Sequence, residues 1–199
     1  RPVFVPDTLG TTQPCSGGCT NPLLKLVDAN GDMTQYAKDQ QGEVFIMKPG
    51  SPGDALTPSD FYLINPGGGG GGQPEIQQAF SECLPDMSLL CGDVEVIANG
   101  NKKPVADGAE ALIGKPNQDI YRGIDRYEHP ADGHIYDTSR SLVVAPLVSL
   151  CSVAGFCPSN KLAPNWPTLT VTGFGQFFIE DVNTSNGQQQ GTVTARFIK

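Results

Sequence analysis

The sequence predicts a mainly β domain with a minor helical part. Glycine and proline together make up about a fifth of the 199 residues, 24 and 17 respectively, so that no long amphipathic helix is free of interruption. Short apolar or alternating segments recur between these breaks, which is typical of strands. We therefore expect a single β-rich domain over residues 1–199, with two short helices, long Gly/Pro-rich loops and a C-terminal β-hairpin.

The predicted strands are short stretches bounded by Gly, Pro or Asn. After an extended N-terminal entry at residues 2–6, strands are expected at residues 23–27, 43–47, 60–64, 93–97, 141–150, 168–181 and 192–199. The last two give the strongest pattern, because alternating residues from Val193 to Phe197 are apolar and an Asn-Gly step lies between the strands. Gly173 and Gly175 indicate a bulge or a close backbone approach.

Two helices are expected. One spans residues 74–83, where a proline occupies the first helical position. The other begins at a capping box formed by Asp107 and Glu110 and ends before Gly114. Its apolar residues recur at helical spacing, which predicts one buried face.

Two longer stretches show no regular pattern. Residues 49–75 form a Gly/Pro-rich loop that contains the glycine run 67–72. No Lys-Ser/Thr pair follows that run, so it does not indicate a phosphate-binding loop. Residues 115–165 are expected to be irregular and insertion-like, apart from the strand at 141–150.

Charge and hydropathy disfavour two classes of partner. The chain carries 13 Lys and Arg against 21 Asp and Glu, a formal net charge of −8, so nucleic acid and anionic lipid surfaces are poor partners. No apolar run reaches the roughly 18 residues of a membrane span. Because the chain starts at Arg1 without an initiator Met, we expect that it is processed or truncated.

The six cysteines indicate an oxidising compartment, because they are even in number and closely spaced in an acidic, turn-rich chain. The expected disulfides join nearest neighbours: Cys15 with Cys19, Cys83 with Cys91, and Cys151 with Cys157. Zinc is disfavoured because the two wider pairs do not have the spacing of a zinc knuckle. A cytosolic protein with free thiols is the alternative.

One acidic loop resembles a calcium-binding loop. Oxygen-bearing side chains stand at its positions 1, 3, 5, 7 and 12, namely Asp28, Asn30, Asp32, Thr34 and Asp39. The loop departs from the calcium pattern at position 6, where Met33 replaces glycine, and at position 12, where Asp replaces Glu. The alternative is an Asn-Gly turn with solvated carboxylates.

A second polar segment contains both histidines of the chain. His129, Asp132, His134 and Asp137 are potential ligands of zinc or manganese. Pro130 and Gly133 exclude a helix there, and the alternative is a polar surface loop. Because no Gly-x-Ser-x-Gly motif is present and bases for a triad are few, we expect no catalytic residues and no cofactor other than calcium.

Several segments, taken in order, carry a family resemblance. They are Arg1–Pro6, Leu24–Leu26, Phe61-Tyr-Leu-Ile-Asn-Pro-Gly-Gly-Gly, the helix with Cys83, Gly92-Asp93-Val94, Asn99-Gly100-Asn101, Gly108–Ile113, Val171–Ile179 and Gly191–Phe197. Together they resemble the C-terminal exported region of bacterial TadG/TadE-like proteins, the minor pseudopilins of Flp/Tad pilus assembly. The segment 115–165 has no counterpart in that pattern.

The resemblance implies a non-enzymatic structural or adhesive component of the bacterial cell surface, in the extracellular space or periplasm, with a membrane helix upstream of Arg1. Its partners would be pilin-like subunits or other copies of the chain, contacted through exposed strand edges such as the C-terminal hairpin. Two alternatives follow from the loops described above. One is a calcium-stabilised extracellular binding module, and the other is a secreted metalloenzyme that uses residues 129–137.

Overall fold

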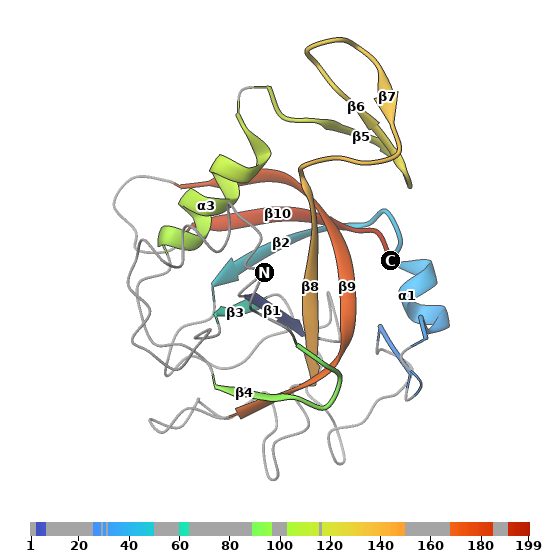
Figure 1. The fold of residues 1–199 in the computed structure, drawn as a ribbon, viewed down its shortest axis with the longest axis vertical. Helices are drawn as coiled ribbons and strands as arrows, with labels where there is room; N and C mark the ends of the chain where they lie inside the picture. The colour runs from blue at the N-terminus through green and yellow to red at the C-terminus, as the bar shows by residue number, and fades with distance from the viewer. Residues whose placement is uncertain are drawn as a thin grey trace.

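The computed structural model describes residues 3–6, 26–28, 30, 32–49, 60–63, 89–96, 103–115, 117–149, 168–184 and 191–199. The predicted helix at 74–83, the glycine run and the Asn186-Gly187 step lie outside the described residues. Within them the chain is mainly β, as predicted (Figure 1). The elements are β1 (Val3–Pro6), α1 (Gln35–Asp39), β2 (Val44–Pro49), β3 (Asp60–Leu63), β4 (Val94–Val96), α3 (Lys103–Ile113), β5 (Ile120–Gly123), β6 (Arg126–Glu128), β7 (Ile135–Tyr136), β8 (Leu142–Ser149), β9 (Thr168–Asn183) and β10 (Thr192–Phe197).

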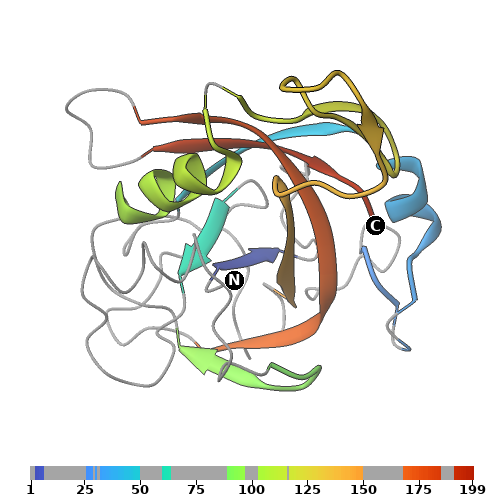
Figure 2. The same ribbon diagram turned by 45° about the horizontal axis from the view of Figure 1, so that its top comes forward.

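The strands form a large sheet and a small one. The large sheet has the order β10-β2-β3-β1-β8-β9-β4, and β10 also pairs with β9, so the series of pairings returns to its start. Its pairings are antiparallel except for β1 with β8 and β2 with β3, which are parallel. The second sheet, called the small sheet below, contains β5, β6 and β7 in antiparallel order. It lies beside the half of β10 that ends at Phe197, whereas α3 lies at the other end (Figures 1 and 2).

The C-terminal hairpin is present, but it is not an edge. β9 and β10 pair antiparallel, with Val193 opposite Val182, as the alternating pattern predicts. β10 also pairs with β2, and β9 also pairs with β8. The expectation that this hairpin offers a free edge for a partner is therefore wrong. Among the described strands, β4, β5 and β7 stand at the ends of their sheets.

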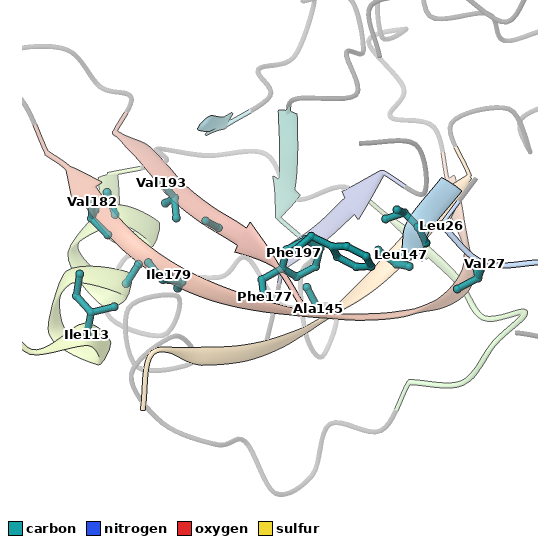
Figure 3. Packing of buried hydrophobic residues seen from close by; sticks show 14 residues of the cluster. Leu26, Val27, Ile113, Ala145, Leu147, Phe177, Ile179, Val182, Val193 and Phe197 are labelled. Carbon is teal, nitrogen blue, oxygen red and sulfur yellow. The ribbon is translucent and has the colours of Figure 1, made fainter. Parts of the chain in front are cut away.

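The main core lies between the large sheet, α3 and the segment around α1 (Figure 3). Phe177 and Ile179 of β9 point into it, together with Val193, Ala195 and Phe197 of β10, so the predicted apolar face of β10 is confirmed. Phe178, between the two inward residues of β9, points to the opposite face and belongs to a second cluster with Tyr127 and Ile198. The β9–β10 pair is therefore covered on both faces.

Both glycines in β9 serve the roles that the sequence indicates. The register of β8 and β9 shifts beside Thr172, which makes a bulge next to Gly173. A Cβ on Gly173 would lie 2.9 Å from a methyl of Val27, and one on Gly175 would lie 2.9 Å from the ring of Phe177. Both positions therefore need the absence of a side chain for the core to close.

The helices differ from their predicted bounds. α3 begins at Lys103, so Asp107 lies inside the helix and does not cap it. Pro104 lies in the first turn, where a residue without an N–H is tolerated. This proline marks the start of the helix, and the prediction did not use it. The predicted end is confirmed, because Gly114 has φ +67°. The short helix α1 was not predicted.

The prediction of an irregular region from residue 115 is wrong over residues 120–136, which form the small sheet. The predicted strands at 43–47, 60–64, 93–97, 141–150 and 168–181 are confirmed as β2, β3, β4, β8 and β9. Of the predicted strand at residues 23–27, the structure describes Leu26 and Val27, and Val27 forms an isolated β-bridge with Met33. A single domain over residues 1–199 stays a prediction.

Candidate functional site

The small sheet packs on the large sheet through a layer of aromatic side chains. Tyr121 of β5 and Tyr127 of β6 face each other across the strands and point to the same side. The ring of Tyr127 stacks on Phe178 with centroids 5.2 Å apart, and Tyr121 lies 5.8 Å from the same ring. Burial raises the pKa of both tyrosines. The alternation of aromatic and polar residues thus gives the small sheet one buried face.

Arg196 of β10 links four parts of the structure at this junction. Its guanidinium donates to the carboxylate of Glu180, with Nε 2.8 Å from Oε1. It also donates to the carbonyl of Gly42, just before β2. The guanidinium carbon lies 4.6 Å from the ring centroid of Tyr121, a cation–π distance. Glu180 is the extra residue of a bulge in β9, which aims its side chain at Arg196.

A buried carboxylate joins the ends of the three strands of the small sheet. Asp119, which is 1% exposed, immediately precedes β5. Its Oδ1 pairs with Nδ1 of His129, the residue after β6, and its Oδ2 accepts from the hydroxyl of Ser139, after β7. The Ser139 hydroxyl also accepts from the backbone N–H of Ser141, 3.0 Å away. Asp119, His129 and Ser139 are called the anchoring cluster below.

The loop between β6 and β7 is held by its own polar groups. The Asp132 carboxylate accepts from the backbone N–H of His134 at 2.9 Å and from the Tyr136 hydroxyl at 2.9 Å. Both hydrogen bonds lower the pKa of Asp132, and the one from the His134 backbone contributes more. The hydrogen bond from the Tyr136 hydroxyl also raises the pKa of Tyr136. The ring of Tyr136 meets that of His129 edge to face, with centroids 5.9 Å apart. The segment is therefore a folded hairpin connection.

The anchoring cluster does not have the arrangement of a hydrolytic triad. In such a triad the serine hydroxyl hydrogen-bonds to the imidazole, which the carboxylate orients from its other side. Here the carboxylate lies in the middle, because the Ser139 hydroxyl donates to Oδ2 of Asp119 and the His129 ring makes an ion-pair contact with Oδ1. The cluster is thus built to join strand ends.

The proposed transition-metal ligands are only partly brought together. Asp132 and His134 are neighbours, with Nδ1 3.7 Å from Oδ1, whereas His129 faces Asp119. Within the part of the chain that the structure describes, no group of three or more His, Cys, Asp or Glu side chains is placed to hold a metal ion. Asp137 is exposed, and the metal site at residues 129–137 stays a prediction.

The acidic loop at residues 28–39 folds as a turn that leads into α1. Oδ1 of Asp28 accepts from the backbone N–H groups of Asn30 and Asp32, at 2.8 and 3.0 Å. The hydroxyl of Thr34 caps α1 by accepting from Ala37 N–H at 3.1 Å. Calcium binding here stays a prediction.

The far end of that loop also has an internal partner. Oδ1 of Asp39, the predicted ligand at position 12, accepts from the side-chain amide of Gln35 at 2.9 Å. Asp28, Thr34 and Asp39 therefore each have a protein partner before any ion binds.

Five of the six cysteines of the predicted disulfides lie outside the described residues. The sixth, Cys91, is exposed in the turn before β4. The three pairings stay predictions. No helix among the described residues is long and apolar enough to cross a membrane.

Comparison with protein-family models, with curated proteins and with solved structures finds no match to this chain. Sequence analysis missed Asp119 and Ser139, because single polar residues in a segment without periodicity carry no signal for burial. The alternation of Ile120, Tyr121 and Arg122 was the available hint of a strand after Asp119.

Proposed function

We propose that the protein is a non-enzymatic structural or adhesive component of the bacterial cell surface, related to Flp/Tad pilus assembly. The resemblance to the exported region of TadG/TadE-like proteins supports this role. The mainly β fold, with a large sheet covered on both faces along β9 and β10, is consistent with a stable extracellular module.

One observation carries the argument against a reactive centre. Two of the four potential metal ligands in the sequence have partners within the small sheet, and the first is His129, which pairs with the buried carboxylate of Asp119. Asp132 likewise binds the residues of its own loop. The function therefore belongs to the outer surfaces of the sheets, where partners are contacted.

Cosedimentation tests this role directly. The purified chain is mixed with pili sheared from a bacterium that has a Flp/Tad system, and the mixture is centrifuged through a sucrose cushion. We expect the chain to pellet with the pili, and to stay in the supernatant with the same preparation from a strain that lacks the major pilin. Equal amounts in both pellets would contradict the proposal.

The proposed compartment has a separate test in the cysteines. Protein isolated in its native state is alkylated without reductant, and its intact mass is measured. We expect no labelled thiol, because three disulfides form in an oxidising compartment. Six labelled thiols would contradict export, whereas reduction before alkylation, as the control, makes all six available.

A further inference from the structure

The end of β9 carries the sequence Asp181-Val-Asn-Thr-Ser185. Its last three residues match Asn-x-Ser/Thr, the pattern at which exported proteins receive a glycan on the asparagine amide. Asn183 is the only asparagine of the chain that is followed in this way by Ser or Thr. The structure describes Asn183 and Thr184, whereas Ser185 lies outside the described residues and belongs to the pattern by sequence. The position of Asn183 decides whether an enzyme can reach its amide.

The side chain of Asn183 lies on the outer face of the large sheet. Val182, one residue earlier, is 3% exposed and belongs to the main core. Because successive side chains of a strand point to opposite faces, Asn183 belongs to the other face, and it is exposed. On the inner side, a Cβ on Gly191 would meet Ala106 of α3 and would lie 3.0 Å from the carbonyl oxygen of Asn183. The backbone here is therefore packed against α3, and the amide is presented on the opposite side.

The backbone at Asn183 is at the limit of the sheet pairing. Asn183 opposite Thr192 is the last pair between β9 and β10, and Thr184 belongs to no helix or strand. The small sheet lies beside the other end of β10 (Figures 1 and 2). An acceptor asparagine has to leave regular pairing to enter an active site, and the ends of elements open at a lower free energy than their interiors. A transferase can thus engage this segment without opening the core.

A carboxylate lies on the same face, two residues before the acceptor. Asp181 and Asn183 share that face, because the pairing from Asp181 to Asn183 is regular and side chains two positions apart point to one side. The Asp181 side chain is 57% exposed even though Lys115 pairs with it. Nζ of Lys115 also donates to the carbonyl of Val182, at 3.0 Å. The acceptor therefore has an exposed negative charge held beside it, which an enzyme can recognise electrostatically.

We propose that Asn183 is an N-glycosylation site, modified after export by an oligosaccharyltransferase that also recognises Asp181. The donor is an oligosaccharide linked through a diphosphate to a polyprenyl lipid. The amide nitrogen of Asn183 forms a bond to C1 of the first sugar, and the bond between C1 and the diphosphate oxygen breaks. The amide gives up one proton, and the lipid diphosphate leaves. This proposal rests on the export included in the proposed function, but not on the pilus role.

Mass spectrometry of the intact protein and of its peptides tests the acceptor. The 199-residue chain is produced with a secretion signal in a bacterial host that contains an oligosaccharyltransferase and a polyprenyl-diphosphate-linked oligosaccharide of known mass. We expect the mass of one oligosaccharide on the peptide that contains Asn183, and none on Asn183→Gln. Asn117→Gln is the matched control, because Asn117 is exposed but lies outside the pattern. An unmodified wild type, in a host that glycosylates a reference acceptor protein, overturns the proposal, as does modification that persists in Asn183→Gln.

Two pairs of variants test what the enzyme recognises. Ser185→Ala removes the hydroxyl of the pattern and is expected to abolish modification, whereas Ser185→Thr retains it. Asp181→Asn removes the charge and is expected to lose most of the glycosylated fraction. Lys115→Ala breaks the same ion pair but keeps the charge, so its glycosylated fraction should match that of the wild type. Modification of Ser185→Ala at the wild-type level overturns N-glycosylation. With both variants folded by circular dichroism, equal fractions in Asp181→Asn and Lys115→Ala overturn the recognition of Asp181.

The outcomes separate this proposal from the proposed function. The secretion signal and the host supply the compartment, so an unmodified chain overturns the glycosylation site and leaves cosedimentation with pili as an independent result. Glycosylation that responds to the variants as expected, together with no cosedimentation, supports the site and contradicts the pilus role.

Discussion

Replacement of Asp119 by alanine removes the carboxylate that joins the ends of the three strands of the small sheet. Hydrogen bonds to charged groups contribute about 1.5–3 kcal/mol each. The contact between His129 and Asp119 is an ion pair without a hydrogen bond at Oδ1 of Asp119, and the His129 side chain is 42% exposed, so this contact contributes at most about 1 kcal/mol. We therefore expect Asp119→Ala to lower the free energy of unfolding by about 3 kcal/mol.

The assay is urea unfolding followed by circular dichroism. With a urea dependence of about 1–3 kcal/mol per molar, the midpoint falls by about 1–3 M. Ser139→Ala is the graded comparison, because it removes the hydrogen bond to Asp119 but leaves the His129 contact in place; we expect it to lower the free energy of unfolding by about 2 kcal/mol. Hydrogen exchange then localises the effect to residues 120–136. A loss below about 0.5 kcal/mol, the usual size for a surface substitution, would refute the role of Asp119 as an anchor.

Three further predictions concern the rest of the fold. Gly175→Ala places a Cβ 2.9 Å from the ring of Phe177 and is expected to lower thermal stability by about 1–3 kcal/mol; an unchanged melting temperature would contradict the close approach. Thr34→Ala removes the cap of α1 and is expected to lower stability by about 1 kcal/mol, whereas Thr34→Ser retains most of it. The hydrogen bond from Lys115 lowers the pKa of Asp181. The pair therefore stabilises the fold at pH values above the ordinary carboxyl pKa of 3.8, and this stabilisation is lost as the pH falls through the lowered pKa of Asp181. Because both side chains are partly exposed, Lys115→Ala is expected to lower stability by less than about 1 kcal/mol at neutral pH and to match the wild type in strong acid; a difference that persists there would contradict the assignment.

The strands of the large sheet could be predicted because they are bounded by Gly, Pro or Asn and are apolar or alternating. β9 and β10 are long enough for alternation to be read over several residues, and the buried face from Val193 to Phe197 follows directly from it. The same pattern does not reveal that β10 also pairs with β2, because that contact joins residues about 150 positions apart. The prediction that the C-terminal hairpin offers a free edge was wrong because β10 pairs with β2.

The small sheet could not be predicted for a different reason. Its strands have four, three and two residues, which is too short for a period to emerge. Its buried face is built from tyrosines, which also occur in exposed loops. The candidate site was missed in part because Asp119 is a charged residue, and charged residues are rarely buried unless they are paired. Only the folded chain brings His129 and Ser139 to it.

The position of β10 has a consequence for how the protein matures. This strand lies between β2 and β9 and contributes Val193, Ala195 and Phe197 to the main core. At a synthesis rate of about 5–20 residues per second, β2 waits roughly 10–30 s at the ribosome for the strand that completes its pairing. The large sheet therefore stays open between β2 and β9 during synthesis, and the main core closes only after β10 has been made.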